Sequence, residues 1–272
     1  MNNFITSASI FSAQQFLLQL VLCISISSLA HAQNPFEEGK QWYEQRATEA
    51  DSFRANPKYI NNAILAFEEA LEKDIYSKKA AAYLLQSYYF KGMFLGMDKD
   101  EQKQVYEKGK SLGEQMIERF PDSVPIKFWY AANSGRWADV HGFLAAATNG
   151  IAKKLRDVCQ DIIAMDEEYQ GGGGYRILAQ VHFHSPNIPL VMGWPSNDKA
   201  LELVKKAIEI APEHPTNLLL YAQILLHFNR NEEALTYLDR IQSLTPRPSN
   251  QVEDRYVQHR AQQLKRKHFG GA

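Results

Sequence analysis

NDKALELVKKAIEIAP, residues 197–212, returns 34 residues later as NEEALTYLDRIQSLTP, residues 231–246. Each copy begins with Asn and closes with Pro, and the residues between them keep the same offsets. The matching positions are Ala200, Val204, Ala207 and Pro212 in the first copy and Ala234, Leu238, Ile241 and Pro246 in the second. Spacings of four and three place the apolar positions on one face of a helix, so each copy predicts a helix with a buried stripe.

A period of 34 residues with this pattern is typical of a tetratricopeptide repeat, in which each unit is a pair of helices. A single pair cannot bury its apolar faces alone, so neighbouring pairs must stack. We therefore expect an all-α, tetratricopeptide-like helical-repeat array. Arrays of this kind are mostly binding surfaces, and their concave face is where they bind.

Helical spacing recurs along most of the chain, and Gly and Pro mark the breaks. We expect about five helix pairs and a C-terminal capping helix, arranged as a bent superhelix. The basic residues in the tail of the capping helix are expected to form a solvated end face. The long second helix of the third pair is expected to break near Gly150. The expected helices are Phe36–Phe53 with Pro57–Lys73, Lys78–Lys91 with Asp98–Phe120, Val124–Arg136 with Trp137–Met165, Tyr175–His184 with Asp198–Ile210, Thr216–Phe228 with Asn231–Ser243, and finally Gln251–Lys267.

The N-terminus has the pattern of an export signal. The first 32 residues contain no Asp, Glu, Lys or Arg, and Phe16 to Ala30 is a mostly apolar run. Ala30-His31-Ala32 is the small-x-small pattern of a secretory cleavage site. We expect a signal peptide over residues 1–32 and a helical-repeat domain over residues 33–272. An uncleaved anchor or a misplaced start is the alternative, because no Lys or Arg precedes the run.

The charge and the cysteine content limit the partners and the disulfides that the sequence predicts. The 272 residues include 30 basic and 31 acidic ones, so no overall field favours nucleic acid or an anionic membrane. Cleavage of the signal would leave only Cys159, which excludes an internal disulfide and is expected to be a buried small hydrophobe. Cys23 is a poor lipid-anchor site because Leu-Val-Leu precedes it.

Three stretches depart from the plain repeat. Residues 127–137, KFWYAANSGRW, contain three adjacent aromatic residues, which must point in three directions on a helix. These side chains either pack in the core or form the wall of a ligand groove. Residues 169–176, YQGGGGYR, lead into a helix. The free N–H groups at the start of that helix, together with Arg176, could hold a carboxylate. The alternative is that the glycines form a connection that lets two helices pack closely. Residues 185–197 are apolar for a loop and are expected to line a pocket or a subunit contact.

No motif indicates chemistry. His182 and His184 are two residues apart on a helix, face different sides and make poor joint metal ligands. The chain has no Gly-x-Ser-x-Gly, His-Glu-x-x-His or Walker motif. We expect no metal, no cofactor, no catalytic residues and no enzymatic activity.

The unusual stretches together resemble one family, the T component associated with tripartite ATP-independent periplasmic (TRAP) transporters, called TatT. The matching residues are Trp129 to Trp137, Asp166 to Ala179, and Met192-Gly193-Trp194. The resemblance covers roughly residues 75–246. It implies a periplasmic, non-catalytic repeat protein that forms trimers, pairs with a substrate-binding P component and helps to deliver a small, hydrophobic ligand.

From this resemblance and the residue chemistry we take five candidate ligand-binding residues, of which Arg176 favours a ligand with a carboxylate. They are Trp129, Asn133, Trp137, Arg176 and Trp194. The competing hypothesis is a scaffold that holds peptide or protein partners in envelope assembly, as repeat arrays often do. Its sign would be polar Asn, Lys and Arg lining the concave face in place of aromatics.

Overall fold

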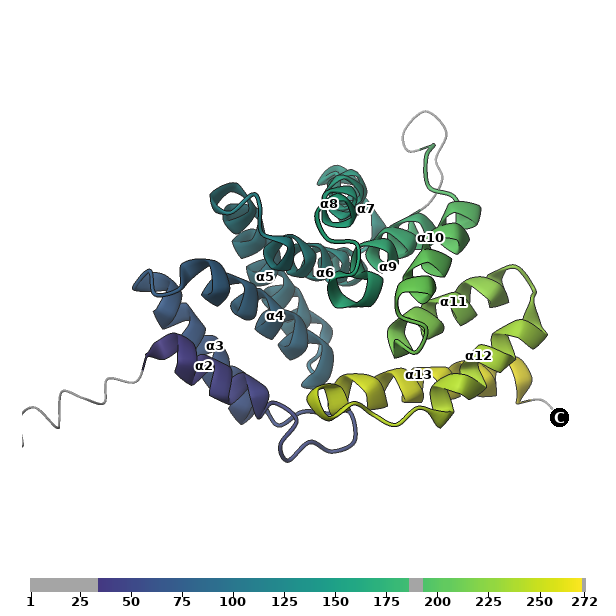
Figure 1. The fold of residues 1–272 in the computed structure, drawn as a ribbon, viewed down its shortest axis with the longest axis horizontal. Coiled ribbons are helices and arrows are strands. Elements are labelled where there is room, and N and C mark those ends of the chain that lie inside the picture. Colours follow the sequence, from purple (N-terminus) through teal and green to yellow (C-terminus); the bar gives the residue numbers. More distant parts are fainter. Residues whose placement is uncertain (1–33, 186–192, 271–272) are drawn as a thin grey trace, which may run out of the picture.

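The computed structural model describes residues 34–185 and 193–270, which form an all-α array without a β-strand. Consecutive helices pack side by side, and the array bends round so that its last helix, α13, reaches back toward the first ones (Figure 1). This confirms the predicted tetratricopeptide-like helical-repeat array. The helices are α2 (Pro35–Glu44), α3 (Pro57–Glu72), α4 (Ser77–Phe94), α5 (Lys99–Arg119), α6 (Val124–His141), α7 (Phe143–Thr148), α8 (Ile151–Met165), α9 (Tyr169–His184), α10 (Asn197–Ile210), α11 (Pro215–His227), α12 (Asn231–Ser243), the 3-10 turn η1 (Pro248–Asn250) and α13 (Gln251–Phe269).

The 34-residue pattern marks the packed face of α10 and α12. The side chains of Ala200, Val204 and Ala207 are fully buried, and so are those of Ala234, Leu238 and Ile241. Small residues at these positions let neighbouring helices approach closely, and their burial removes apolar surface from water. The same spacing in α3 buries Ala63, Phe67 and Ala70, so the first unit uses the same packing rule.

The third pair departs from the prediction. Trp137 lies inside α6, which continues to His141, and the expected helix Trp137–Met165 is divided into the end of α6, α7 and α8. The breaks fall at Gly142, with φ of 89°, and at Gly150, with φ of 62°. Positive φ ends a helix and favours glycine. The sequence predicts the break near Gly150 but not the one at Gly142.

The first helix is also shorter than predicted. It ends at Glu44, and the chain then turns through Glu49 and Ser52, both with positive φ, before α3 begins at Pro57. Pro57 occupies the first turn of α3, where its missing N–H removes no helical hydrogen bond.

The last helix does more than cap the final repeat. Its second half packs on α11 and α12, where Val257 and Ala261 are buried with Leu238. Its first half reaches the N-terminal unit, where Val252 is buried in the cluster that contains Phe94. The helix predicted as an end cap is therefore a strap that joins the two ends of the bent array.

Several predictions concern residues outside the described part of the chain. These are the signal peptide over residues 1–32, with Cys23, and the portion of the apolar loop from residue 186 to 192. Among the described helices, none is long and apolar enough to cross a bilayer.

Candidate functional site

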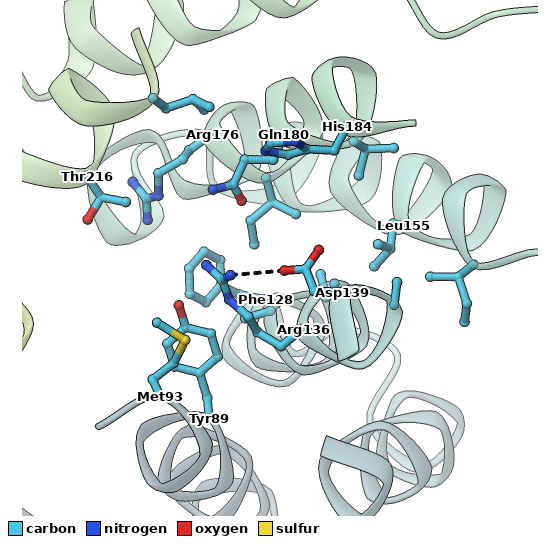
Figure 2. A pocket seen from close by; sticks show the side chains of 18 of the residues that line it. Tyr89, Met93, Phe128, Arg136, Asp139, Leu155, Arg176, Gln180, His184 and Thr216 are labelled. Carbon is cyan, nitrogen blue, oxygen red and sulfur yellow. Dashed lines mark hydrogen bonds and ion pairs between the residues drawn. The ribbon is translucent and has the colours of Figure 1, made fainter. Parts of the chain in front are cut away.

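A cavity of about 1020 Å³ lies between the strap and the repeat helices. Residues of α4, α6, α7, α8, α9, α11 and α13 line it, and Figure 2 shows side chains from several of these helices converging on the same space. Small-molecule sites in proteins are of this size, concave and mostly apolar with a few polar groups.

Much of the wall is apolar. Phe128 and Trp129 of α6 meet edge to face with ring centroids 4.9 Å apart, and Trp129 lies 5.5 Å from Tyr89 of α4. Leu155 of α8 and Ile177 of α9 lie at the same cavity. Burying a ligand against such a surface is favourable in proportion to the apolar area removed from water.

The charged groups of the wall are mostly basic. They are Arg136, Lys153, Arg156, Arg176, Arg247 and Arg260, against the carboxylates Asp139 and Glu253. Three of the arginines are paired with carboxylates, Arg136 with Asp139 at 3.0 Å, Arg156 with Asp157 at 3.0 Å and Arg247 with Asp254 at 2.7 Å. Because the basic groups outnumber the acidic ones, the cavity favours an anion over a cation.

Arg176 is held at the cavity by the glycine turn that precedes it. Its Nη1 donates to the carbonyl oxygen of Gln170 at 3.2 Å and to the Asn217 side-chain oxygen at 2.7 Å. The Asn217 amide in turn donates to Gly171 at 3.0 Å and to Ala207 at 2.9 Å. Asn217 thus ties α9, α10 and α11 together and fixes the guanidinium of Arg176, a residue that is only 7% exposed.

The glycine stretch itself permits close helix packing. Gly171 and Gly172 have φ of 62° and 74°, and α9 becomes regular after them. A β-carbon on Gly172 would lie 2.8 Å from the Cα of Ala207, so only glycine fits against α10. This agrees with the interpretation of the stretch as a close-packed connection, and Arg176 satisfies carbonyl groups of the turn.

His214, at the start of α11, also lines the cavity. Its Nδ1 is buried and has no hydrogen-bond partner among the described residues. Burial, and then the charges of Arg176 and Arg247, lower the pKa of His214 to about 2, so the ring is neutral at physiological pH.

Three of the five candidate residues meet at this cavity. Trp129, Arg176 and Trp194 line it. The guanidinium of Arg156 lies 4.8 Å from the ring centroid of Trp194, and His182 packs edge to face on the same ring at 5.0 Å. Trp194, from the apolar loop, thus covers the end of the cavity beside α8, as expected for pocket lining.

Asn133 and Trp137 lie elsewhere. Asn133 is fully buried and donates from its side chain to the backbone oxygen of Leu85 at 2.9 Å, which joins α6 to α4. Trp137 donates from Nε1 to Glu107 of α5 and stacks on His141 with centroids 4.2 Å apart. Both side chains pack helices together and do not border the cavity.

The three adjacent aromatics point in three directions, as predicted. Phe128 lies below Arg176, with 5.9 Å between the guanidinium carbon and the ring centroid, and Trp129 packs on Tyr89. Tyr130 faces α5, where a β-carbon on Gly113 would approach its ring to 2.6 Å. One aromatic therefore serves packing, and the other two form the cavity wall.

His182 and Cys159 have structural surroundings, whereas His184 lines the cavity. His182 Nδ1 accepts a hydrogen bond from the Ser196 N–H at 3.2 Å. Cys159 is fully buried, and burial raises the pKa of its thiol, which makes it inert. In the described ranges, no group of three or more His, Cys, Asp or Glu side chains is arranged to hold a metal ion.

Sequence reasoning missed the contributions of α4, α11 and the strap. Tyr89, His214, Thr216 and Tyr256 line the cavity, yet none is singled out by the sequence pattern. Arg260, from the basic tail predicted to be a solvated end face, lines the cavity as well. Arg136 could have been predicted from the sequence, because it lies in the aromatic stretch. An arginine on a helix with three neighbouring aromatic residues is a reasonable candidate for ligand binding. The remaining residues required knowledge of how the array bends.

Comparison with known proteins supports the fold. Residues 196–252 match the tetratricopeptide repeat family. A thermophilic tetratricopeptide protein of Thermus thermophilus superposes with a TM-score of 0.58 at 16% identity, over 85% of this chain and 98% of that one. The TPR2AB domain of yeast Sti1, in complex with pHSP90, is 16% identical over 86% of this chain and 99% of that one, with a TM-score of 0.32, too low to carry an argument. No curated protein sequence matches. The chain therefore has a tetratricopeptide-like helical-repeat fold.

Proposed function

We propose that this chain is a non-enzymatic binding protein that holds a small hydrophobic or carboxylate ligand in the cavity closed by α13. The observation that carries the proposal is the cavity itself, of about 1020 Å³, with aromatic walls and an excess of arginines. A pocket of this kind captures a ligand by burying its apolar part and orienting its polar part.

The position of the strap favours a small ligand over a peptide. An extended or helical peptide in a repeat array lies along the concave face. Here the side chains of Glu253, Tyr256 and Val257 of α13 border that space. Aromatic residues such as Phe128 and Trp129 also line it, which the scaffold hypothesis did not predict, whereas the arginines beside them are of the kind that it did predict.

The biological setting that we propose is the one implied by the resemblance to TatT. The protein is exported by a signal peptide over residues 1–32, acts in the periplasm and pairs with the substrate-binding P component of a TRAP transporter. A homo-oligomer, in the form of a trimer, belongs to the same proposal. The scaffold for envelope assembly is the second candidate, supported by the tetratricopeptide match over residues 196–252.

The test is co-purification from the envelope of the native host. The tagged protein should be recovered in the periplasmic fraction with a P component. The variant Ala132→Trp, which fills the cavity at α6, should still recover the P component but without small molecule, because Ala132 lines the cavity. Recovery of envelope-assembly proteins without a P component would favour the scaffold and contradict the transport role.

A further inference from the structure

Arg176 is a buried charge without a counter-ion. It is 7% exposed, and within the described ranges no carboxylate forms an ion pair with it. Its hydrogen bonds to described residues all leave from Nη1, whereas Nε and Nη2 make none. A mostly buried charge without a counter-ion is costly to the fold, and a bound anion would reduce that cost.

A second unsatisfied group lies beside the same turn. Nδ1 of His214 is buried without a partner among the described residues. Arg176 and His214 both lie against Gly171, since Arg176 Nη1 is 3.5 Å from the Gly171 oxygen and a β-carbon at Gly171 would lie 3.0 Å from His214 Cδ2. The guanidinium of Arg176, which lacks a counter-ion, and the unpartnered Nδ1 of His214 therefore both border the Gly171 turn at one end of the cavity.

The charge at this end persists at physiological pH. Burial, together with the nearby charge of Arg247, lowers the pKa of Arg176 to about 10. The guanidinium is therefore still protonated at neutral pH. Arg247 is itself neutralised by Asp254, with 2.7 Å between Nη2 and Oδ1, so it does not replace the missing counter-ion.

The cavity beyond this end becomes apolar along α9. Figure 2 shows Arg176, Gln180 and His184 in order along that helix, with Phe128 and Leu155 on the opposite side. The eight steps along the helix from Arg176 to His184 span about 12 Å at the rise of an α-helix. Trp194 closes the cavity near the far end, beside His182.

We propose that the ligand is an amphipathic carboxylic acid, whose carboxylate binds Arg176 and His214 and whose apolar body extends along α9 toward Leu155 and Trp194. The inference rests on the proposed function, because it names the ligand class for the same cavity. A carboxylate accepts two hydrogen bonds from a guanidinium in a planar arrangement. Nε and Nη2 of Arg176 are the pair of donors that remain for it.

The hydrogen bonds that Arg176 makes to the glycine turn do not require an arginine. Nη1 alone satisfies the oxygens of Gln170, Gly171 and Asn217. A lysine or a neutral amide at this position would serve the turn with fewer buried donors. The remaining donors and the buried nitrogen of His214 indicate a ligand.

The test uses decanoate and 1-decanol, which each have ten carbons and differ in charge. Binding to the full protein, after removal of bound lipid, is measured by isothermal titration calorimetry. We expect decanoate to bind wild type more tightly than decanol. Arg176→Gln should weaken decanoate binding by roughly 30-fold or more and leave decanol binding almost unchanged, because only decanoate loses a charge partner.

Arg156→Gln is the matched control. It removes a guanidinium from the same cavity wall, but one that is paired with Asp157 and lies over Trp194 at the other end. Decanoate affinity should change by less than about threefold. A loss as large as that of Arg176→Gln would show that only the overall charge of the cavity matters and would overturn the proposed position of the carboxylate.

A second variant covers the case in which Arg176→Gln does not fold. Thr216 precedes Asn217 in α11 and lines the cavity near Arg176 (Figure 2). Thr216→Asp places a carboxylate there while the hydrogen bonds of Arg176 to the turn remain. It should reduce decanoate binding as strongly as Arg176→Gln and spare decanol.

The outcomes separate this inference from the proposed function. If decanoate and decanol bind wild type and both variants equally, the cavity is a binding site but Arg176 is not a carboxylate site, and the inference fails alone. If neither compound binds wild type, while the protein is folded, both the ligand class and the small-ligand role are overturned.

Discussion

Arg46, in the turn after α2, and Glu253 of α13 form an ion pair with 2.7 Å between Nη2 and Oε1, although 207 positions separate them. Arg46 also donates to the Ser249 carbonyl oxygen at 2.5 Å, and its guanidinium lies over the Tyr43 ring at 4.4 Å. This contact joins the first unit of the array to the strap and closes the ring around the cavity.

Breaking this contact should destabilise the whole fold. The Arg46 side chain is 8% exposed and that of Glu253 is 21% exposed, so Arg46→Gln leaves a largely buried carboxylate without its partner. We expect a loss of about 2 to 3 kcal/mol in the free energy of unfolding, measured by chemical denaturation. The more exposed pair between Lys265 of α13 and Asp239 of α12 is the control, and Lys265→Gln should cost less than about 1 kcal/mol. Equal losses would mean that the ring closure contributes nothing.

The first half of the strap should detach when its aromatic contacts are removed. The Tyr256 ring lies 5.6 Å from Phe94 and 5.8 Å from Phe53. Tyr256→Ala should increase amide hydrogen exchange at residues 251–257 by about tenfold or more, as expected for loss of about 1.4 kcal/mol of packing. Arg255→Ala, at an exposed position of α13, should leave exchange unchanged. Unchanged exchange in Tyr256→Ala would show that the strap is held by its second half alone.

Gly172 is expected to tolerate no side chain. Gly172→Ala forces a β-carbon within 2.8 Å of the Ala207 backbone at a φ of 74°, so it should destabilise the protein by about 2 to 3 kcal/mol. Gly135→Ala is the control, because no atom lies within 4 Å of the added carbon and alanine is the better helix former by about 1 kcal/mol. Thermal melting of the two variants should shift in opposite directions, and a shift in the same direction would contradict the packing described for α9.

The lowered pKa of His214 makes the stability of the folded protein sensitive to acid. An unfolded histidine binds a proton below about pH 6.5, whereas folded His214 does so only near its pKa of about 2. The unfolded state therefore takes up more protons as the pH falls, and the free energy of unfolding decreases by up to about 1.4 kcal/mol per pH unit below pH 6.5.

His214→Gln removes this titration, so its stability should fall less steeply than that of wild type between pH 6.5 and 4.5. Above pH 7 the two proteins should show equal slopes, because His214 is neutral in both states. Denaturation curves at intervals of half a pH unit provide the measurement. Parallel curves over the acidic range would mean that the His214 ring is hydrated in the folded protein.

The repeat pattern predicted the helix packing because it depends on local spacing. Ala200, Val204 and Ala207 follow one helix face, and that face is buried whatever the global shape. The three aromatics after Lys127 were also predictable, since consecutive residues on a helix point about 100° apart.

The cavity was only partly predictable because it depends on the bend of the array. Residue spacing shows which helix faces are buried, but not which of them faces the concave side of the array. Trp129, which lines the cavity, therefore could not be distinguished by sequence from Asn133 and Trp137, which do not. The strap was missed for a similar reason. Val252 and Val257 of α13 pack on opposite ends of the array, and a contact across 207 positions leaves no periodic signal.

The most direct test of the small-ligand account is native mass spectrometry of the protein as its native host produces it, purified under gentle conditions. The account predicts a protein that carries a small acidic, lipophilic molecule, released on denaturation and absent from the cavity-filled variant Ala132→Trp. A ligand-free protein that instead captures a protein partner would contradict it and support the envelope scaffold.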